Sequence, residues 1–129
     1  MTIDSIEATD RLDVVRETMG RTARAPGRTA ADITLIAVSK TQEAAAIRPL
    51  IAAGQRSFGE NRVQEAQGKW PELRAETPDI ALHLVGQLQS NKAADAVAVF
   101  DVIQSLDRPS LLPALAKAMD AAGKRRPCL

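Results

Sequence analysis

The chain has 129 residues, of which 45% are apolar and 26% charged, and its formal net charge is +1. This composition is ordinary for a soluble globular protein and excludes a disordered tail. The small net charge gives no reason to expect nucleic acid or an anionic membrane as a partner. The single cysteine, Cys128, excludes an internal disulfide and suits a reducing compartment. The N-terminus is polar, and no apolar run approaches the roughly 20 residues that span a bilayer. Together these features predict a cytoplasmic protein.

Residues 4–24 have apolar side chains at helical spacing and predict one amphipathic helix, which the segment 25–32 interrupts. Four short β-rich runs then alternate with four segments rich in Ala and Leu that have a helical pattern. The strands are expected at 34–38, near 57–59, at 81–85 and at 99–104, and the helices at 43–53, 61–76, 90–98 and 110–122.

This alternation predicts an α/β fold in which a parallel sheet is covered by helices, with four β/α units behind an N-terminal helix. Gly54 and Gly123 stand where helix C-caps belong. Thr41 and Ser90 stand where N-caps belong, as does Asp107 or Ser110 for the last helix. Pro49 is expected to kink or shorten the helix at 43–53.

In parallel α/β folds, ligands gather at the carboxyl ends of the strands. Lys40 closes the first strand, and we expect the strand end to remove it partly from water and leave a free amine that attacks an aldehyde. The alternative is that the Lys40 side chain simply extends into solvent, and the position of Lys40 in the sequence pattern alone favours this alternative.

Two further polar residues stand near strand ends. Asn61 is a candidate hydrogen-bonding partner for a ligand hydroxyl or phenolate, or else the cap of the following helix. His83 lies within the third strand, where a hydrogen-bonded core histidine is more common than a ligand-binding one. The segment 86–92 lacks the ending of a phosphate-binding loop, and no cluster of residues has metal-ligand spacing.

Four segments in order resemble the pyridoxal phosphate homeostasis protein family, also called the YggS/PROSC family. The segments are 35–41 (LIAVSKT), 58–65 (FGENRVQE), 83–92 (HLVGQLQSNK) and 103–108 (IQSLDR). The resemblance implies a parallel (β/α) barrel of the alanine racemase N-terminal type, truncated here to about four β/α units.

The resemblance also implies that Lys40, in the VSK motif, holds pyridoxal 5′-phosphate (PLP) as a Schiff base and that Asn61 lies near the cofactor ring. His83 and Lys92 match motif positions without an assigned role. Family members are PLP carriers without established turnover, and PLP-dependent apo-enzymes are the candidate recipients. A PLP-dependent racemase is the alternative function, but alanine racemase-like enzymes use a tyrosine opposite the lysine, and this sequence contains none.

An eight-stranded barrel typically takes about 250 residues. Residues 1–129 are therefore expected to form the N-terminal half of one PLP-binding barrel domain, and the segment 126–129 falls where a fifth strand should begin. The first and fourth strands should be open edges, which makes the isolated chain prone to aggregate or to pair with a second half-barrel. A fragment that binds no cofactor is the remaining alternative.

Overall fold

The computed structural model describes residues 2–24 and 27–129. Helix α1 (Thr2–Arg24) precedes a four-stranded sheet of β1 (Ala37–Val38), β2 (Ser57–Glu60), β3 (Ala81–Leu84) and β4 (Val102–Ile103). All neighbouring strands are parallel, and their order in the sheet is their order in the chain. The α/β fold with a parallel sheet is thus confirmed.

The helices between and after the strands lie where the sequence predicts them. They are α2 (Ala44–Ala52), α3 (Val63–Glu76), α4 (Ala93–Val99) and α5 (Leu111–Ala122), with the short 3-10 helices η1 (Ala30–Asp32) and η2 (Ser90–Lys92). In α5 the buried residues Leu111, Leu115 and Ala118 recur every three or four positions, and this apolar stripe is part of the core at the side where α5 packs on α4.

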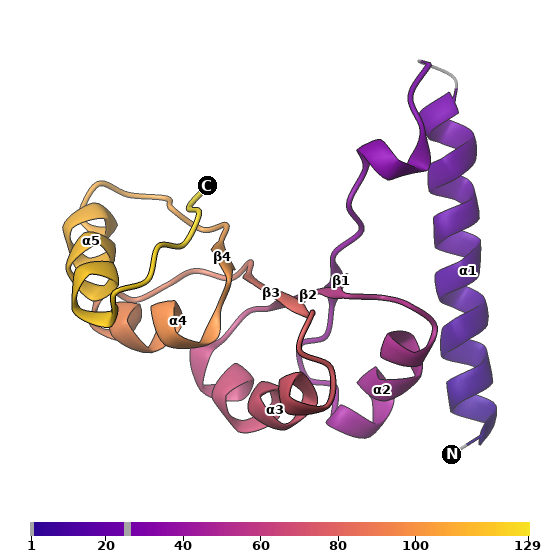
Figure 1. Cartoon of the computed structure of the whole chain (residues 1–129), viewed down its shortest axis with the longest axis horizontal. Helices are drawn as coiled ribbons and strands as arrows, with labels where there is room; N and C mark the ends of the chain where they lie inside the picture. The colour runs from indigo at the N-terminus through magenta and orange to yellow at the C-terminus, as the bar shows by residue number, and fades with distance from the viewer. Residues whose placement is uncertain (1, 25–26) are drawn as a thin grey trace.

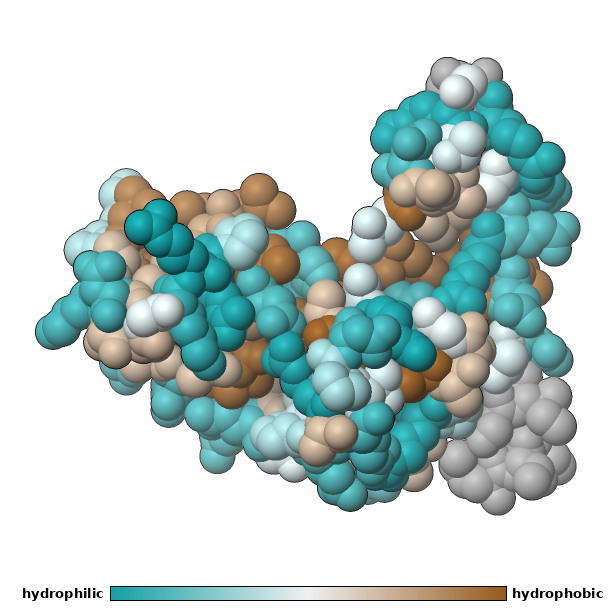
Figure 2. All heavy atoms as spheres, viewed as in Figure 1, coloured by the Kyte–Doolittle hydropathy of each residue, from teal (hydrophilic) through white to brown (hydrophobic). Residues whose placement is uncertain are grey.

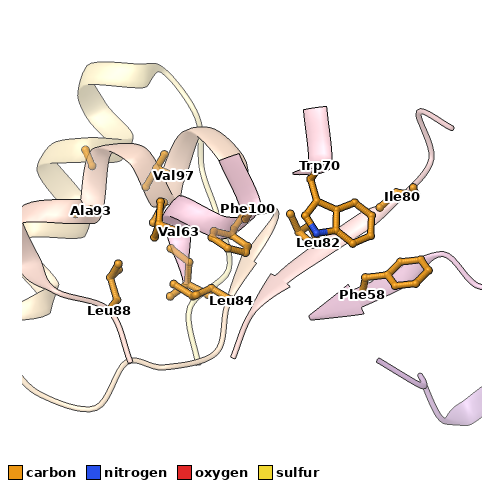
Figure 3. Packing of buried hydrophobic residues seen from close by; sticks show 14 of the residues in the cluster. Phe58, Val63, Trp70, Ile80, Leu82, Leu84, Leu88, Ala93, Val97 and Phe100 are labelled. Carbon is orange, nitrogen blue, oxygen red and sulfur yellow. The ribbon is translucent and has the colours of Figure 1, made fainter. Parts of the chain in front are cut away.

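The two faces of the sheet differ. Helices α2, α3 and α4 lie below the sheet in the view of Figure 1, α5 lies beside α4 at the β4 end of the molecule, and α1 stands beside α2. Leu82 and Leu84 of β3 point into the helix-covered core, as do Phe58 of β2 and Ile103 of β4. Figure 3 shows Phe58 beside Trp70 of α3, with ring centroids 5.0 Å apart. Because side chains alternate along a strand, the residues between these point to the opposite face.

We call this opposite side the open face, because no described helix covers it in Figure 1. Four residues at one level of the sheet define it: Val38, Gly59, His83 and Val102. Val38 is 51% exposed, and apolar atoms are visible in the hollow between the α5 side of the molecule and α1 (Figure 2). The expectation that helices cover the sheet is therefore met on one face only.

Two predicted strands are shorter than expected. Pairing in β1 covers Ala37–Val38 rather than 34–38, and Gln55 takes up the Leu35 carbonyl with its side-chain amide at 2.7 Å. β4 begins at Val102 rather than 99, because α4 continues to Val99 and the Phe100 amide still donates to the Ala96 carbonyl at 2.8 Å.

The two glycines stand at helix C-termini as predicted, and Ser110 occupies the N-cap position of α5 without a capping side-chain hydrogen bond. Gly54 and Gly123 have φ of 98° and 64°, a conformation that glycine adopts at little cost. Thr41 does not cap α2, whose N-cap position is Glu43, and Ser90 belongs to η2. Pro49 lies inside the nine-residue helix α2, in agreement with the expected short helix. Ala25 and Pro26, within the predicted break, lie outside the described residues.

The edge of β4 is not open, contrary to expectation. The Ile103 amide donates to the Pro127 carbonyl at 2.9 Å, and the Leu129 amide donates to the Ile103 carbonyl at 2.8 Å. Cys128 forms a parallel bridge with Ile103. Residues 127–129 thus lie where the sequence predicts the start of a fifth strand.

Candidate functional site

The carboxyl ends of β1 and β2 bring the two predicted site residues to one edge of the sheet. The Ser39 amide donates to the Gly59 carbonyl at 2.9 Å, which continues the β1–β2 pairing beyond Val38. Lys40 and Asn61 follow one step further on their strands. Since the Ser39 side chain turns toward the helices, strand alternation assigns Lys40 to the open face.

The amine of Lys40 is accessible. The residue is exposed, and within residues 2–24 and 27–129 no hydrogen bond or ion pair of its ammonium group is found. The expectation that the strand end removes Lys40 from water is therefore wrong, because the Lys40 side chain is exposed. The prediction that the Lys40 amine is available for reaction does not require Lys40 to be buried.

The backbone around Lys40 forms a tight turn. The Gln42 amide donates to the Ser39 carbonyl at 3.1 Å, and Thr41 has a positive φ of 63°, which is unusual for a non-glycine residue. The Thr41 amide also donates to Glu65 Oε2 of α3 at 2.6 Å. Burial alone would raise the pKa of Glu65, but the hydrogen bonds from Lys69 and the Thr41 amide lower it below its usual value.

A buried polar cluster lies behind this turn, on the helix side of the sheet. The Glu60 side chain is fully buried, and its Oε2 accepts hydrogen bonds from Ser39 Oγ at 2.5 Å and Trp70 Nε1 at 2.9 Å. Lys69 Nζ lies 2.8 Å from the same oxygen. Sequence reasoning missed Glu60 and Lys69, because Glu60 reads as one of several polar residues after a strand and Lys69 as an ordinary helix-surface lysine.

Asn61 is held by a close backbone contact. A Cβ atom built on Gly86 would lie 2.4 Å from the Asn61 carbonyl oxygen and 2.7 Å from its Cα atom. Asn61 does not cap α3, because the N-cap position is Arg62 and no side chain caps that helix. The alternative reading of Asn61 as a helix cap is therefore wrong.

His83 lies on the open face, at the level of Gly59 on the neighbouring strand. It is buried, and its Nδ1 atom has no hydrogen-bond partner within the described part of the chain. Burial lowers the pKa of His83, and the charge of Asp101 opposes this effect only in part. The interpretation of His83 as a hydrogen-bonded core residue is thus contradicted at Nδ1.

A cleft of about 520 Å³ opens beside β1, between α1 and α2, and Val38, Ser39, Ile47 and Leu50 are among its lining residues. Lys40 and Asn61 do not line it. The two predicted site residues therefore lie outside this cleft.

In the described residues, no group of three or more His, Cys, Asp or Glu side chains is arranged to hold a metal ion. None of the described helices is long and apolar enough to cross a membrane.

Comparison with known proteins supplies independent information. No protein-family model matches the sequence. The pyridoxal phosphate homeostasis protein of Pseudomonas aeruginosa is 44% identical over 99 residues, which cover 77% of this chain and 42% of that protein. This chain therefore spans less than half the length of that curated relative.

Solved structures agree with the sequence match. PipY of Synechococcus elongatus with PLP bound is 43% identical with a TM-score of 0.79, over 94% of this chain and 52% of that one. An unknown protein from Bifidobacterium adolescentis is 30% identical with a TM-score of 0.93, over 100% of this chain and 56% of that one. The resemblance to the N-terminal portion of this family of proteins is thus confirmed.

Proposed function

We propose that this relative of pyridoxal phosphate homeostasis proteins is the N-terminal half of such a protein, residues 1–129, and binds PLP through Lys40 in the cytoplasm. One observation carries the proposal. Lys40, whose side chain is exposed, and Asn61 follow the carboxyl ends of the neighbouring parallel strands β1 and β2.

The residues present fit this cofactor. PLP supplies an aldehyde that a free lysine amine captures reversibly as a Schiff base. Lys40 provides the amine, and the Asn61 side chain can both donate and accept hydrogen bonds to polar substituents of a ring. The PLP-bound structure of PipY supports this assignment, because it aligns over 94% of this chain.

We propose a carrier rather than an enzyme. Proton transfer on both faces of a substrate needs two bases, and this chain has no tyrosine to serve as the second. A carrier needs only affinity and reversibility. PLP-dependent apo-enzymes are the proposed recipients of the cofactor, and a racemase-like enzyme is the alternative.

The same proposal includes a barrel. Four parallel strands in sequential order, with residues 127–129 hydrogen-bonded along β4, support the proposal that these units belong to a (β/α) barrel. The phosphate of PLP would then be held largely outside these four β/α units, as the family resemblance implies, and affinity in this chain alone should be weak.

A PLP titration tests the proposed function. We expect addition of PLP to the chain to produce the visible absorbance of a lysine adduct, and we expect Lys40→Ala to abolish it. Lys117→Ala is the matched control, since Lys117 is an exposed lysine on α5, away from the strand ends. Equal spectra for Lys40→Ala and Lys117→Ala would overturn the assignment of Lys40. Racemisation of an amino acid by the PLP-loaded chain would favour the enzyme alternative.

A further inference from the structure

Lys69 binds the inside of the turn that carries Lys40. Its Nζ donates to the Ser39 carbonyl and the Gln42 carbonyl, both at 2.8 Å, and to Glu65 Oε2 at 3.0 Å. These bonds use all three donors of an ammonium group. The two carbonyls flank Lys40 and Thr41, so one cation fixes both ends of the turn.

Glu60 contacts both Lys69 and the turn from the helix side of the sheet. Its Oε2 lies 2.8 Å from Lys69 Nζ and accepts from Ser39 Oγ, so the same carboxylate contacts the cation and the residue that precedes Lys40. The Lys69 side chain is 8% exposed and that of Glu60 is 0% exposed. Glu60 also directly precedes Asn61 in the chain.

A buried ion pair is an expensive way to stabilise a fold, because both charges lose their hydration. Well-packed apolar residues at such positions are often as stable or more so, whereas a buried polar pair can fix one conformation. Here the conformation it fixes includes a strained one, the positive φ of Thr41 next to Lys40.

We propose that Lys69 and Glu60 are positioning residues that hold the turn of residues 39–42, so that the amine of Lys40 projects onto the open face beside Asn61. Neither side chain touches the cofactor in this account. The proposal rests on the proposed function for its consequence in PLP binding, but the ordering of the turn is measurable without PLP.

The variant that tests it removes both charges together, because a single change would leave an unpaired buried charge and could prevent folding. Lys69→Met with Glu60→Gln keeps the side-chain shapes and an acceptor for Trp70 Nε1. The matched control is Arg48→Met with Glu76→Gln, which removes an exposed ion pair of 3.0 Å between α2 and α3. Circular dichroism first establishes that both variants are folded.

Amide hydrogen exchange is the readout that needs no cofactor. In the Lys69/Glu60 variant we expect a peptide covering residues 40–43 to exchange at least tenfold faster than in the unmodified chain, with residues 81–84 unchanged. The Arg48/Glu76 control should leave both segments unchanged. Unchanged exchange at 40–43 in the folded Lys69/Glu60 variant would overturn the proposal.

PLP trapping is the second readout. Borohydride-trapped PLP should be found on Lys40 in the unmodified chain and the control, whereas in the Lys69/Glu60 variant the share on Lys40 should fall at least fivefold relative to exposed lysines. Unchanged selectivity for Lys40 in that variant would overturn the proposal. If the unmodified chain itself fails to label at Lys40, the proposed function fails, and the exchange experiment still decides the role of Lys69 and Glu60.

Discussion

The backbone of Gly86 approaches Asn61 so closely that a Cβ atom at Gly86 would stand 2.4 Å from the Asn61 carbonyl oxygen. Gly86 follows β3, and Asn61 follows β2, so the contact joins the carboxyl ends of two neighbouring strands. The atoms that a Cβ would meet belong to the backbone and cannot turn away as a flexible side chain could. The contact therefore fixes the place of Asn61 in the site.

We expect Gly86→Ala to displace Asn61, to destabilise the chain by about 1–3 kcal/mol as other overpacking substitutions do, and to weaken PLP binding. Urea unfolding and a PLP titration measure the two effects. Gly68→Ala is the control, because a Cβ at Gly68 on α3 meets no atom within 4 Å. That change should stabilise the helix by about 0.5–1 kcal/mol. Equal free energies of unfolding and equal PLP binding in Gly86→Ala and Gly68→Ala would contradict the role assigned to Gly86.

His83 should make stability depend on pH. Because burial lowers the pKa of His83 in the folded chain, the unfolded chain binds a proton first as the pH falls through the usual value near 6.5. The free energy of unfolding therefore decreases below that pH, until the folded histidine also becomes protonated. Above it both states are neutral, and His83 contributes no pH dependence.

Urea unfolding of the unmodified chain and of His83→Gln between pH 7.5 and 5.5 measures this contribution. The difference between the two free energies of unfolding should change with pH, by at most about 1.4 kcal/mol per pH unit. Carboxylates common to both proteins cancel in the difference. A difference that stays constant over this range would show that His83 titrates alike in both states.

Residues 127–129 should protect the edge of β4. Their deletion removes three backbone hydrogen bonds of 2.8–2.9 Å, those between Ile103, Leu106 and this segment. At about 0.5–1.5 kcal/mol for each bond, the loss is about 1.5–4.5 kcal/mol, and the uncovered edge should promote aggregation. Light scattering measures the aggregation, and urea unfolding measures the loss of free energy of unfolding. Leu129→Ala, which keeps the backbone of a residue that is 70% exposed, should change neither.

The open four-stranded sheet has a consequence for association. The outer edge of β1 and the open face present unpaired backbone groups and apolar side chains such as the half-exposed Val38. We expect the chain to associate as its concentration rises, which sedimentation velocity can follow. A monomer that unfolds cooperatively at all concentrations tested would show that four β/α units are sufficient on their own.

Much of the fold could be predicted from the sequence because each element has a local cause. The stripe of Leu111, Leu115 and Ala118 predicts α5, and Gly123 ends it. The lengths of β1 and β4 could not be predicted in this way. Pairing of residues 34–36 depends on a neighbouring strand, and the start of β4 depends on how far α4 continues, and both are set by tertiary packing.

The site was predictable only in part. Lys40 and Asn61 follow strand ends that the alternation of elements already predicts, and the parallel pairing of β1 with β2 puts these two ends at one edge of the sheet. The partnership of Glu60 with Lys69 could not be foreseen, since it depends on which face of α3 turns toward β2. Amphipathic spacing alone suggests a solvent-exposed lysine at position 69.

The central claim is that the amine of Lys40 captures PLP, and peptide mapping after reduction tests it most directly. The chain is incubated with PLP, reduced with borohydride and digested, and the modified lysine is identified by mass spectrometry. The account predicts that the adduct is found mainly on the peptide containing Lys40 and that Asn61→Ala lowers its yield. An adduct spread evenly over exposed lysines such as Lys117 and Lys124, or one confined to another residue, would contradict it.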